Sequence, residues 1–221
     1  MTPLNIILAI VVFLNLCLSL FVLSQNFSSI NNRFFGLLSL LGALWTLSNY
    51  MTGIQPYPFW LESTYAFGGL VIAVGLIWIL VVIEQKIDLK KCLLIFITFF
   101  TFSVFSYYPG FISRHYDQIY SGGVFIGQIG IGLILYTVTF LAGATYILIK
   151  LYIEKRRTKL GDRKSQLQLI FYGTLILVII SALTSFILPS LSIFSFGGLD
   201  SIGLLFFMFF IAFVAAGIRP R

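Results

Sequence analysis

Long unbroken runs of apolar residues, separated by short polar connections, dominate the chain. Each run can cross about 30 Å of hydrocarbon as a helix, whereas the strands of a membrane barrel alternate over segments of about 10 residues. Every backbone amide in lipid needs an internal partner, so this pattern predicts helices. We therefore expect an all-α integral membrane bundle of seven helices, forming a single domain over residues 1–221. The predicted helices cover approximately residues 3–24, 34–53, 61–84, 92–108, 125–150, 166–188 and 200–218.

The positions of lysine and arginine orient this bundle. If the N-terminus is outside, 13 of the 14 basic residues fall in cytoplasmic connections or at the C-terminus, and Arg114 alone lies outside. Cytoplasmic connections of membrane proteins carry such an excess. An even number of helices would break the alternation. The pattern therefore predicts an outside N-terminus, a cytoplasmic C-terminus and a multi-pass protein of the plasma (inner) membrane, with the lipid bilayer as its first partner.

The composition supports the same class. Hydrophobic residues make up 59% of the chain and charged residues 10%, with a mean hydropathy of +1.04, whereas about 25% of the residues in a soluble domain are charged. The net charge of +7 follows from the cytoplasmic basic residues. We therefore expect no nucleic-acid partner.

Several chemical functions lose support because their residues are absent. None of the 21 charged residues falls near the middle of a predicted helix, although pumps, ion-coupled transporters and voltage sensors depend on such groups. No intramembrane protease constellation occurs. The two cysteines, Cys17 and Cys92, form no metal-binding or redox motif and are interpreted as packing residues. We therefore expect no catalytic residues, no metal and no cofactor, and hence no enzyme.

Polar and aromatic residues gather at the outer ends of the predicted helices. One interpretation is an interfacial belt of Trp and Tyr, with acidic groups that meet water. The other is a ligand-binding cup on the outer face, with apolar walls and a few convergent polar groups. Six candidates would line this cup: Trp60, Glu62, Tyr65, Asn49, Gln128 and Asp200.

The connection between the fifth and sixth predicted helices carries the densest basic cluster. It could anchor the protein to anionic lipid, at about 1 kcal/mol for each charge, or it could also dock a cytoplasmic output module. The cluster consists of Lys155, Arg156, Arg157, Lys159, Arg163 and Lys164. Five glycines at residues 122–132 crowd the start of the fifth predicted helix, where they could allow close helix packing or act as a hinge.

Several stretches along the chain form a familiar set. They are Asn32–Leu38 with Ala43-Leu44-Trp45, Phe59-Trp60 with Tyr65, Gln166–Leu169, Gly198-Leu199-Asp200 and Gly217-Ile218-Arg219. Together they resemble the seven-transmembrane N-terminal sensor region of bacterial histidine kinases, and the resemblance covers nearly the whole chain.

The resemblance implies a sensory input module that perceives an external or membrane signal and passes it to a cytoplasmic kinase or similar partner. It also implies a homodimer, because kinase output domains work as dimers. A kinase needs a cytoplasmic phosphoacceptor histidine and a nucleotide-binding domain, but the sole histidine, His115, is expected outside. We therefore expect a domain of a longer receptor or a stand-alone relative. The alternatives are a small transporter and a structural membrane subunit; a lipid-modifying enzyme has less support.

Overall fold

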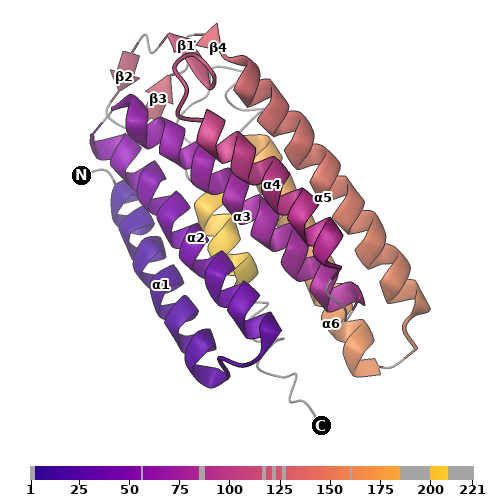
Figure 1. The fold of residues 1–221 in the computed structure, drawn as a ribbon. Helices are drawn as coiled ribbons and strands as arrows, with labels where there is room; N and C mark the ends of the chain where they lie inside the picture. The colour runs from indigo at the N-terminus through magenta and orange to yellow at the C-terminus, as the bar shows by residue number, and fades with distance from the viewer. Residues whose placement is uncertain are drawn as a thin grey trace.

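The computed structural model describes residues 3–55, 57–84, 88–115, 118–120, 123–125, 128–159, 161–184 and 200–208. Within this part of the chain, six helices, four short strands and a helical segment at 200–208 form an elongated bundle (Figure 1). The helices are α1 (Pro3–Gln25), α2 (Ile30–Ile54), α3 (Pro58–Glu84), α4 (Leu89–Phe105), α5 (Ile131–Arg157) and α6 (Gly161–Ala182). The strands are β1 (Ser113–His115), β2 (Gln118–Tyr120), β3 (Gly123–Phe125) and β4 (Gln128–Ile129).

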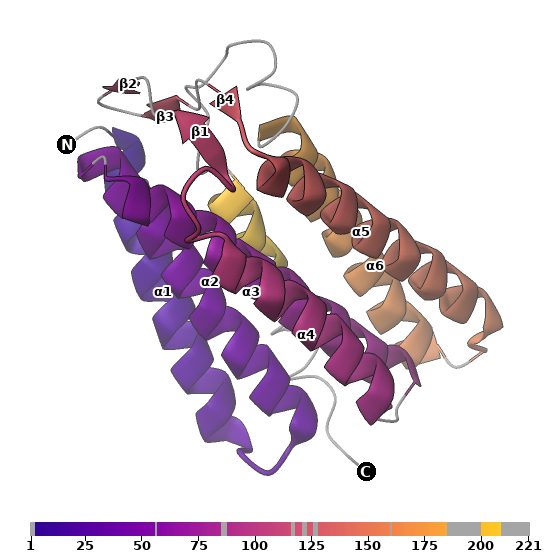
Figure 2. The same cartoon turned by 45° about the horizontal axis from the view of Figure 1, so that its top comes forward.

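Consecutive helices run antiparallel, so the bundle has two distinct ends (Figures 1 and 2). We call the end that carries Pro3 and the four strands the strand end. The opposite end, where α5 ends at Arg157 and α6 begins at Gly161, is the basic end. Helices α1 to α4 pack in chain order, and α5 packs against α3 and α6. The 200–208 segment lies in the interior between α2 and α6.

Small residues allow the helices to approach closely, and serine hydroxyls link their backbones. Ser19 and Ser39 join α1 to α2 by hydrogen bonds to the carbonyls of Gly36 and Asn15, both at 2.8 Å. Ser103 joins α4 to α3 through the carbonyl of Ala66 at 2.7 Å. Such contacts are typical of helix pairs in membranes, where burial of apolar surface drives association only weakly.

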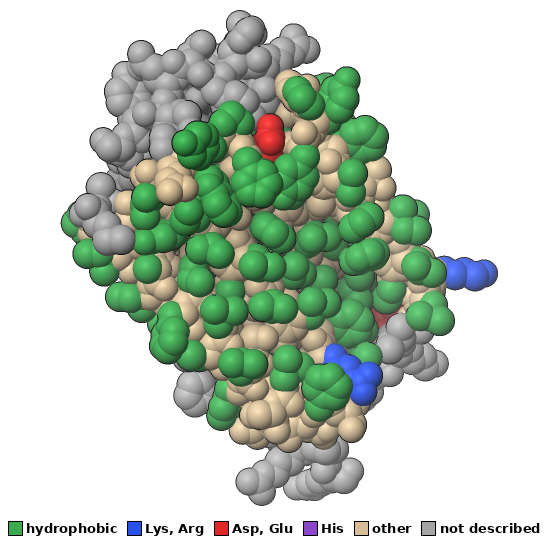
Figure 3. Space-filling model, turned by 60° about the vertical axis from the view of Figure 1, so that its left-hand side comes forward, with side chains coloured by type: hydrophobic (Ala, Val, Ile, Leu, Met, Phe, Trp, Pro, Cys, Tyr) green, Lys and Arg blue, Asp and Glu red, His purple; other side chains and the backbone are tan. Residues whose placement is uncertain are grey.

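Lengths and surfaces match the expected membrane protein. Among the described residues, five helices are long and apolar enough to cross a membrane: α1, α2, α3, α5 and α6 without its first two residues. The 17 residues of α4 lie at the lower bound for a spanning helix. Hydrophobic side chains cover the middle of the face in Figure 3, and lysine and arginine lie toward its margins. The expected helical membrane bundle is therefore confirmed at this level.

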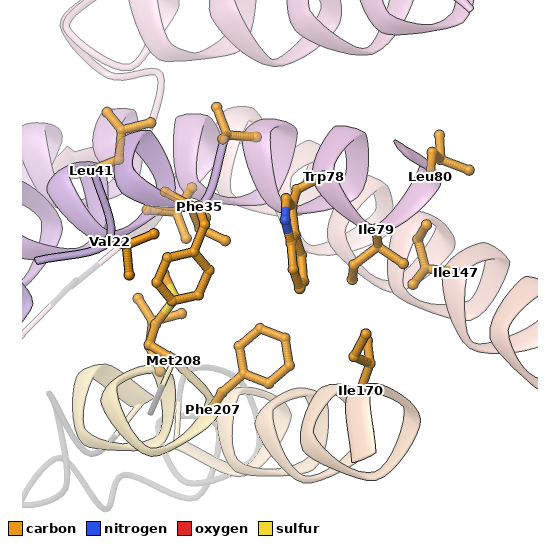
Figure 4. Packing of buried hydrophobic residues seen from close by; sticks show 14 of the residues in the cluster. Val22, Phe35, Leu41, Trp78, Ile79, Leu80, Ile147, Ile170, Phe207 and Met208 are labelled. Carbon is orange, nitrogen blue, oxygen red and sulfur yellow. The ribbon is translucent and has the colours of Figure 1, made fainter. Parts of the chain in front are cut away.

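The hydrophobic core is formed by residues of α1, α2, α3, α5, α6 and the 200–208 segment, and Ile95 of α4 packs against it. Phe35 of α2 and Trp78 of α3 meet edge to face, with ring centroids 6.0 Å apart. In the same cluster, Phe207 of the 200–208 segment lies beside Ile170 of α6, and Met208 lies near Phe35 (Figure 4). This core lies toward the basic end and holds the 200–208 segment against α2, α3 and α6.

The prediction that the fifth helix begins near residue 125 was wrong, because α5 begins at Ile131. Residues 123–125 and 128–129 are strands, pairing antiparallel with β2 and β1. Glycine is a poor helix former, and glycines at 122, 123, 127 and 130 weaken a helix there. Gly130 has a second constraint, because a Cβ at this position would run into the backbone of Phe111. This contact is with the connection after α4 rather than with another helix, so close helix packing and a hinge both stay predictions for these glycines.

The connection between α5 and α6, which carries the basic residues in the prediction, is shorter than predicted. Lys155, Arg156 and Arg157 form the last turn of α5, and Arg163 and Lys164 lie in the first turns of α6. Of the six basic candidates, Lys159 alone lies between the helices. Cations near a helix C-terminus interact favourably with the helix dipole, which lets α5 continue through this charged stretch.

Candidate functional site

An elongated cavity with a volume of about 100 Å³ lies between α2, α3, α5, α6 and the 200–208 segment. Its wall on α3 runs from Gly68 to Ile79. At 1.5 Å per residue this stretch is about 16 Å long. Most of the lining is apolar, and the polar lining side chains except Thr174 lie toward the strand end. The cavity is therefore a narrow apolar slot with a polar end.

Three elements bring polar atoms together at this polar end. Gly68 of α3 makes room for them: a Cβ at Gly68 would lie 2.8 Å from the Tyr136 hydroxyl of α5 and 3.3 Å from the Trp45 indole nitrogen of α2. Ser181 of α6 also lines the cavity. The missing side chain at Gly68 thus lets two hydrogen-bonding groups from different helices converge beside the α3 backbone.

Asp200 is the acidic residue of this polar end. Its side chain lines the cavity, and the residue is 7% exposed. One carboxylate oxygen accepts a hydrogen bond from the backbone N–H of Ser201 at 2.8 Å, at the start of the helical segment. Asp200 also interacts electrostatically with Tyr65 and Tyr136. Burial of an ionisable side chain among membrane helices is costly and usually accompanies a function.

The structure brings together three of the six cup candidates: Tyr65, Asn49 and Asp200. The Tyr65 ring meets the Tyr136 ring edge to face, with centroids 5.5 Å apart. The Asn49 amide nitrogen donates to the Ser201 hydroxyl at 3.1 Å, which fixes the start of the 200–208 segment against α2. Asp200 therefore lines the cavity, and Tyr65 and Asn49 support the groups that form its polar end.

The other three candidates lie away from the cavity lining. Trp60 packs edge to face against Phe59 in the first turn of α3. Glu62 lies one turn before Tyr65 and is half-buried, with interactions of its own. Gln128 belongs to β4, opposite His115 of β1, and its side chain lies outside the described part of the chain. The cavity lining therefore does not include these three candidates.

No family model matches this chain, and no curated protein or solved structure matches it. The site is accordingly interpreted from its own geometry.

Two aromatic residues of the site, Trp45 and Tyr136, were not among the candidates. The candidates were chosen near the ends of the predicted helices, whereas Trp45 lies near the middle of α2 and Tyr136 falls well inside the predicted fifth helix, which was expected to begin at residue 125. Tyr136 had a usable signal, because it is a polar aromatic in the strand-end half of its helix. Gly68 had none, since only the approach of α2 and α5 shows what its missing side chain permits.

The basic end carries a separate network of ion pairs around Glu84, the last residue of α3. Its carboxylate lies 3.4 Å from the Lys91 ammonium of α4 and 3.9 Å from that of Lys150 of α5. Arg163 of α6 pairs with Glu154 of α5 at 3.7 Å. These pairs are partly exposed, so each adds little stability, but together they join the ends of α3, α4, α5 and α6.

The groups at the polar end can recognise a ligand by charge, hydrogen bonding and contact with aromatic rings. The polar end combines an acidic carboxylate, a tyrosine hydroxyl and aromatic faces beside an apolar slot. The described residues hold no group of three or more His, Cys, Asp or Glu side chains that could bind a metal ion. The arrangement suits a small molecule with an apolar body and one polar end.

Proposed function

We propose that this chain is a membrane sensory module that binds a small apolar ligand in the cavity and passes the binding event to its basic end. The observation that carries this proposal is the apolar slot with Asp200 at one end. The slot lies between helices from both halves of the chain. A ligand inside it would alter the contacts of α5 and α6, whose far ends carry the basic residues.

The inner wall of the cavity favours sensing over transport. Ile79 and Ile147 line the slot toward the basic end, and beyond them Ile83, Leu151 and Ile170 are buried in the hydrophobic core. A transporter needs a second opening at this end, whereas here the end is filled by the hydrophobic core. Through this core, a ligand in the slot would change the packing of α3, α5 and α6.

The proposal includes seven membrane spans, an outside N-terminus and a cytoplasmic basic end in the plasma membrane. A cytoplasmic kinase or similar protein would receive the signal there, and the module would act as a homodimer. The positive-inside pattern and the resemblance to sensor regions support this arrangement. The module itself carries out no catalysis.

Cysteine labelling tests the orientation. In a variant with Cys17 and Cys92 replaced by alanine, Tyr57→Cys in the α2–α3 connection should react with a membrane-impermeant maleimide on intact cells. Thr158→Cys at the basic end should react only after the cells are permeabilised. The reverse pattern would overturn the proposed direction of signalling.

Spin labels test transmission to the basic end. The label sites Ser28→Cys and Lys159→Cys lie in exposed connections at this end. The distance between the two spin labels can be measured in lipid nanodiscs by double electron–electron resonance. Binding of a single-chain dodecyl amphiphile should shift that distance. Ala144→Leu, which fills the cavity wall, should abolish the shift, whereas Ala142→Leu on the exposed face of α5 should retain it.

The alternatives give different results in the same preparation. A transporter would carry the amphiphile into proteoliposomes. A structural subunit would show neither uptake nor a distance change. Binding without any shift at the basic end would reject the sensory function.

A further inference from the structure

We propose that the cavity selects a single-chain amphiphile with a cationic head, such as an alkylammonium. The inference rests on the proposed ligand-binding function and names the chemical class of the ligand. Asp200 and the aromatic side chains at the strand end would receive the head, and the slot along α3 would receive the chain.

The shape of the cavity selects a slender apolar chain. The slot is about 16 Å long on α3, but its volume is only about 100 Å³. An apolar cavity of about 150 Å³ holds one benzene molecule, so this cavity does not enclose a fused ring system and encloses only part of a long alkyl chain. Gly75 widens the slot halfway along, because a Cβ there would meet only Leu38, at 3.7 Å. The slot is partly open, so a linear chain can lie along its length with the remainder of the chain outside it.

The charge at the polar end selects the head group. An ionised carboxylate accepts hydrogen bonds and cannot donate them. A head that donates hydrogen bonds or carries positive charge would stabilise Asp200 in this form, whereas a second carboxylate would be repelled by it. In a buried site of low dielectric constant this discrimination is stronger than in water.

The aromatic residues reinforce the same preference. Trp45, Tyr136 and Phe140 line the cavity, and Tyr65 stands against Tyr136. The face of an aromatic ring attracts a cation, and tryptophan does so best; sites for quaternary ammonium ligands are built from such rings. A carboxylate and aromatic rings lining one cavity can thus complement an ammonium group by two independent interactions.

The position of the head also suits a ligand that comes from the membrane. Asp200 lies in the strand-end half of the bundle, and the apolar slot continues from it toward the basic end. An amphiphile already aligned with the lipids would keep its orientation on entering the cavity. Its head would pass from the interface to Asp200, and its chain would stay in an apolar environment.

Photolabelling with three matched probes tests this inference. Each probe has the same dodecyl chain with a diazirine, and the heads are a primary ammonium, a hydroxyl and a carboxylate. The protein is held in nanodiscs of neutral lipid, and labelled peptides are mapped by mass spectrometry. We expect labelling of cavity-lining peptides with a preference of about tenfold or more for the ammonium over the carboxylate, which corresponds to about 1.4 kcal/mol. The unlabelled amine should compete.

Two Asp→Asn variants test whether Asp200 causes the labelling preference for the ammonium probe. Asp200→Asn keeps an oxygen that can accept from Ser201 N–H, so the helical segment retains its start, but the preference for ammonium should fall to about that of the hydroxyl probe. Asp88→Asn makes the same change at the basic end, outside the cavity lining, and should leave the preference intact.

The outcomes distinguish the head-group inference from the proposed function. Equal labelling by all three probes, blocked by Ala144→Leu, would overturn the cationic preference and leave the ligand-binding function standing. A preference that survives Asp200→Asn would also overturn it. Absence of cavity labelling by every probe would overturn both proposals.

Discussion

Arg163 of α6 donates a hydrogen bond from Nη2 to the backbone carbonyl of Ile83 in the last turn of α3, at 3.2 Å. The carbonyls of the last helical turn have no partner within their own helix. A guanidinium from the start of α6 therefore completes the end of α3, while Glu154 of α5 holds the same guanidinium at 3.7 Å. One side chain joins three helices at the end where we propose that the signal emerges.

Arg163→Ala should lower the stability of the basic end. The variant loses the hydrogen bond to Ile83 and the pair with Glu154, which together contribute about 1 kcal/mol at this partly exposed site. We expect Tm to fall by about 2–4 °C for a chain of this length. Lys164→Ala, at the exposed neighbouring position, is the control and should change Tm by less than about 1 °C. Equal shifts in the two variants would show that the contact with α3 contributes nothing specific.

Asn15→Leu should stabilise the protein. Asn15 lies in the middle of α1 and is fully buried, and its side-chain nitrogen and oxygen have no hydrogen-bond partner among the described residues. An unsatisfied buried polar group costs about 1–3 kcal/mol, and leucine of similar size removes this cost. Thermal unfolding in detergent should show a higher Tm.

Asn15→Asp provides the opposite change at the same position. It places an ionisable group at the centre of the bilayer, at a cost of about 2.5–3.5 kcal/mol, and should lower both Tm and expression. A lower Tm for Asn15→Leu as well would mean that the amide has a partner in the folded protein.

Gly130→Ala should disrupt the connection between the strands and α5. A Cβ at Gly130 would meet the backbone of Phe111, which cannot move as a flexible side chain can. Overpacking of this kind costs about 1–3 kcal/mol. Gly161→Ala, at the first residue of α6 with open space around it, should be neutral or slightly stabilising. The comparison is made by thermal unfolding, and similar Tm values for the two variants would contradict the close packing.

Acidification should loosen the start of α4. Asp88 caps this helix by accepting hydrogen bonds from the backbone N–H groups of Lys91 and Lys90. The hydrogen bond from the Lys91 backbone, followed by the interactions with its ammonium, lowers the pKa of the Asp88 carboxyl below its usual value. The stabilisation is therefore complete above the ordinary aspartate pKa and is lost as the pH falls through the lowered pKa of the folded protein.

Hydrogen exchange of the first turn of α4 measures this effect. The protection factor, which is the exchange rate corrected for the intrinsic pH dependence of amide exchange, should fall in the wild type only at pH values below about 4, the usual range of an aspartate. In Asp88→Ala the protection factor should already be low at neutral pH, because alanine accepts no hydrogen bond from Lys90 or Lys91. A wild-type profile that is flat through this range would contradict the capping role.

The sequence indicated where the cup candidates lie along their helices but not which way their side chains face. Tyr65, Asn49 and Asp200 were selected because they lie near the same ends of their helices, and the structure brings them into one region. Trp60 and Glu62 satisfy the same rule but lie outside the cavity lining. The depth of a side chain in the membrane depends on its position along the helix. The direction in which it faces depends on how each helix is rotated about its own axis relative to its neighbours. Short connections do not determine that rotation.

Local chemistry also decided where the helices begin and end. Glycines near 122–130 move the start of α5 to Ile131, and favourable placement of cations at a helix C-terminus extends α5 to Arg157. Both signals were present in the sequence. The apolar run outweighed them in the prediction, because hydrophobicity locates a membrane span but does not fix its ends.

The sequence by itself determined the solvent and the class of structure, because apolar runs of membrane-spanning length with so few charges are stable only as helices in lipid. The tertiary structure alone decided that Gly68, Trp45 and Tyr136 meet beside Asp200 at the end of a narrow cavity. The physical reason is that the cavity depends on contacts among five helical segments, and such contacts follow from the packing of whole helices rather than from any local pattern.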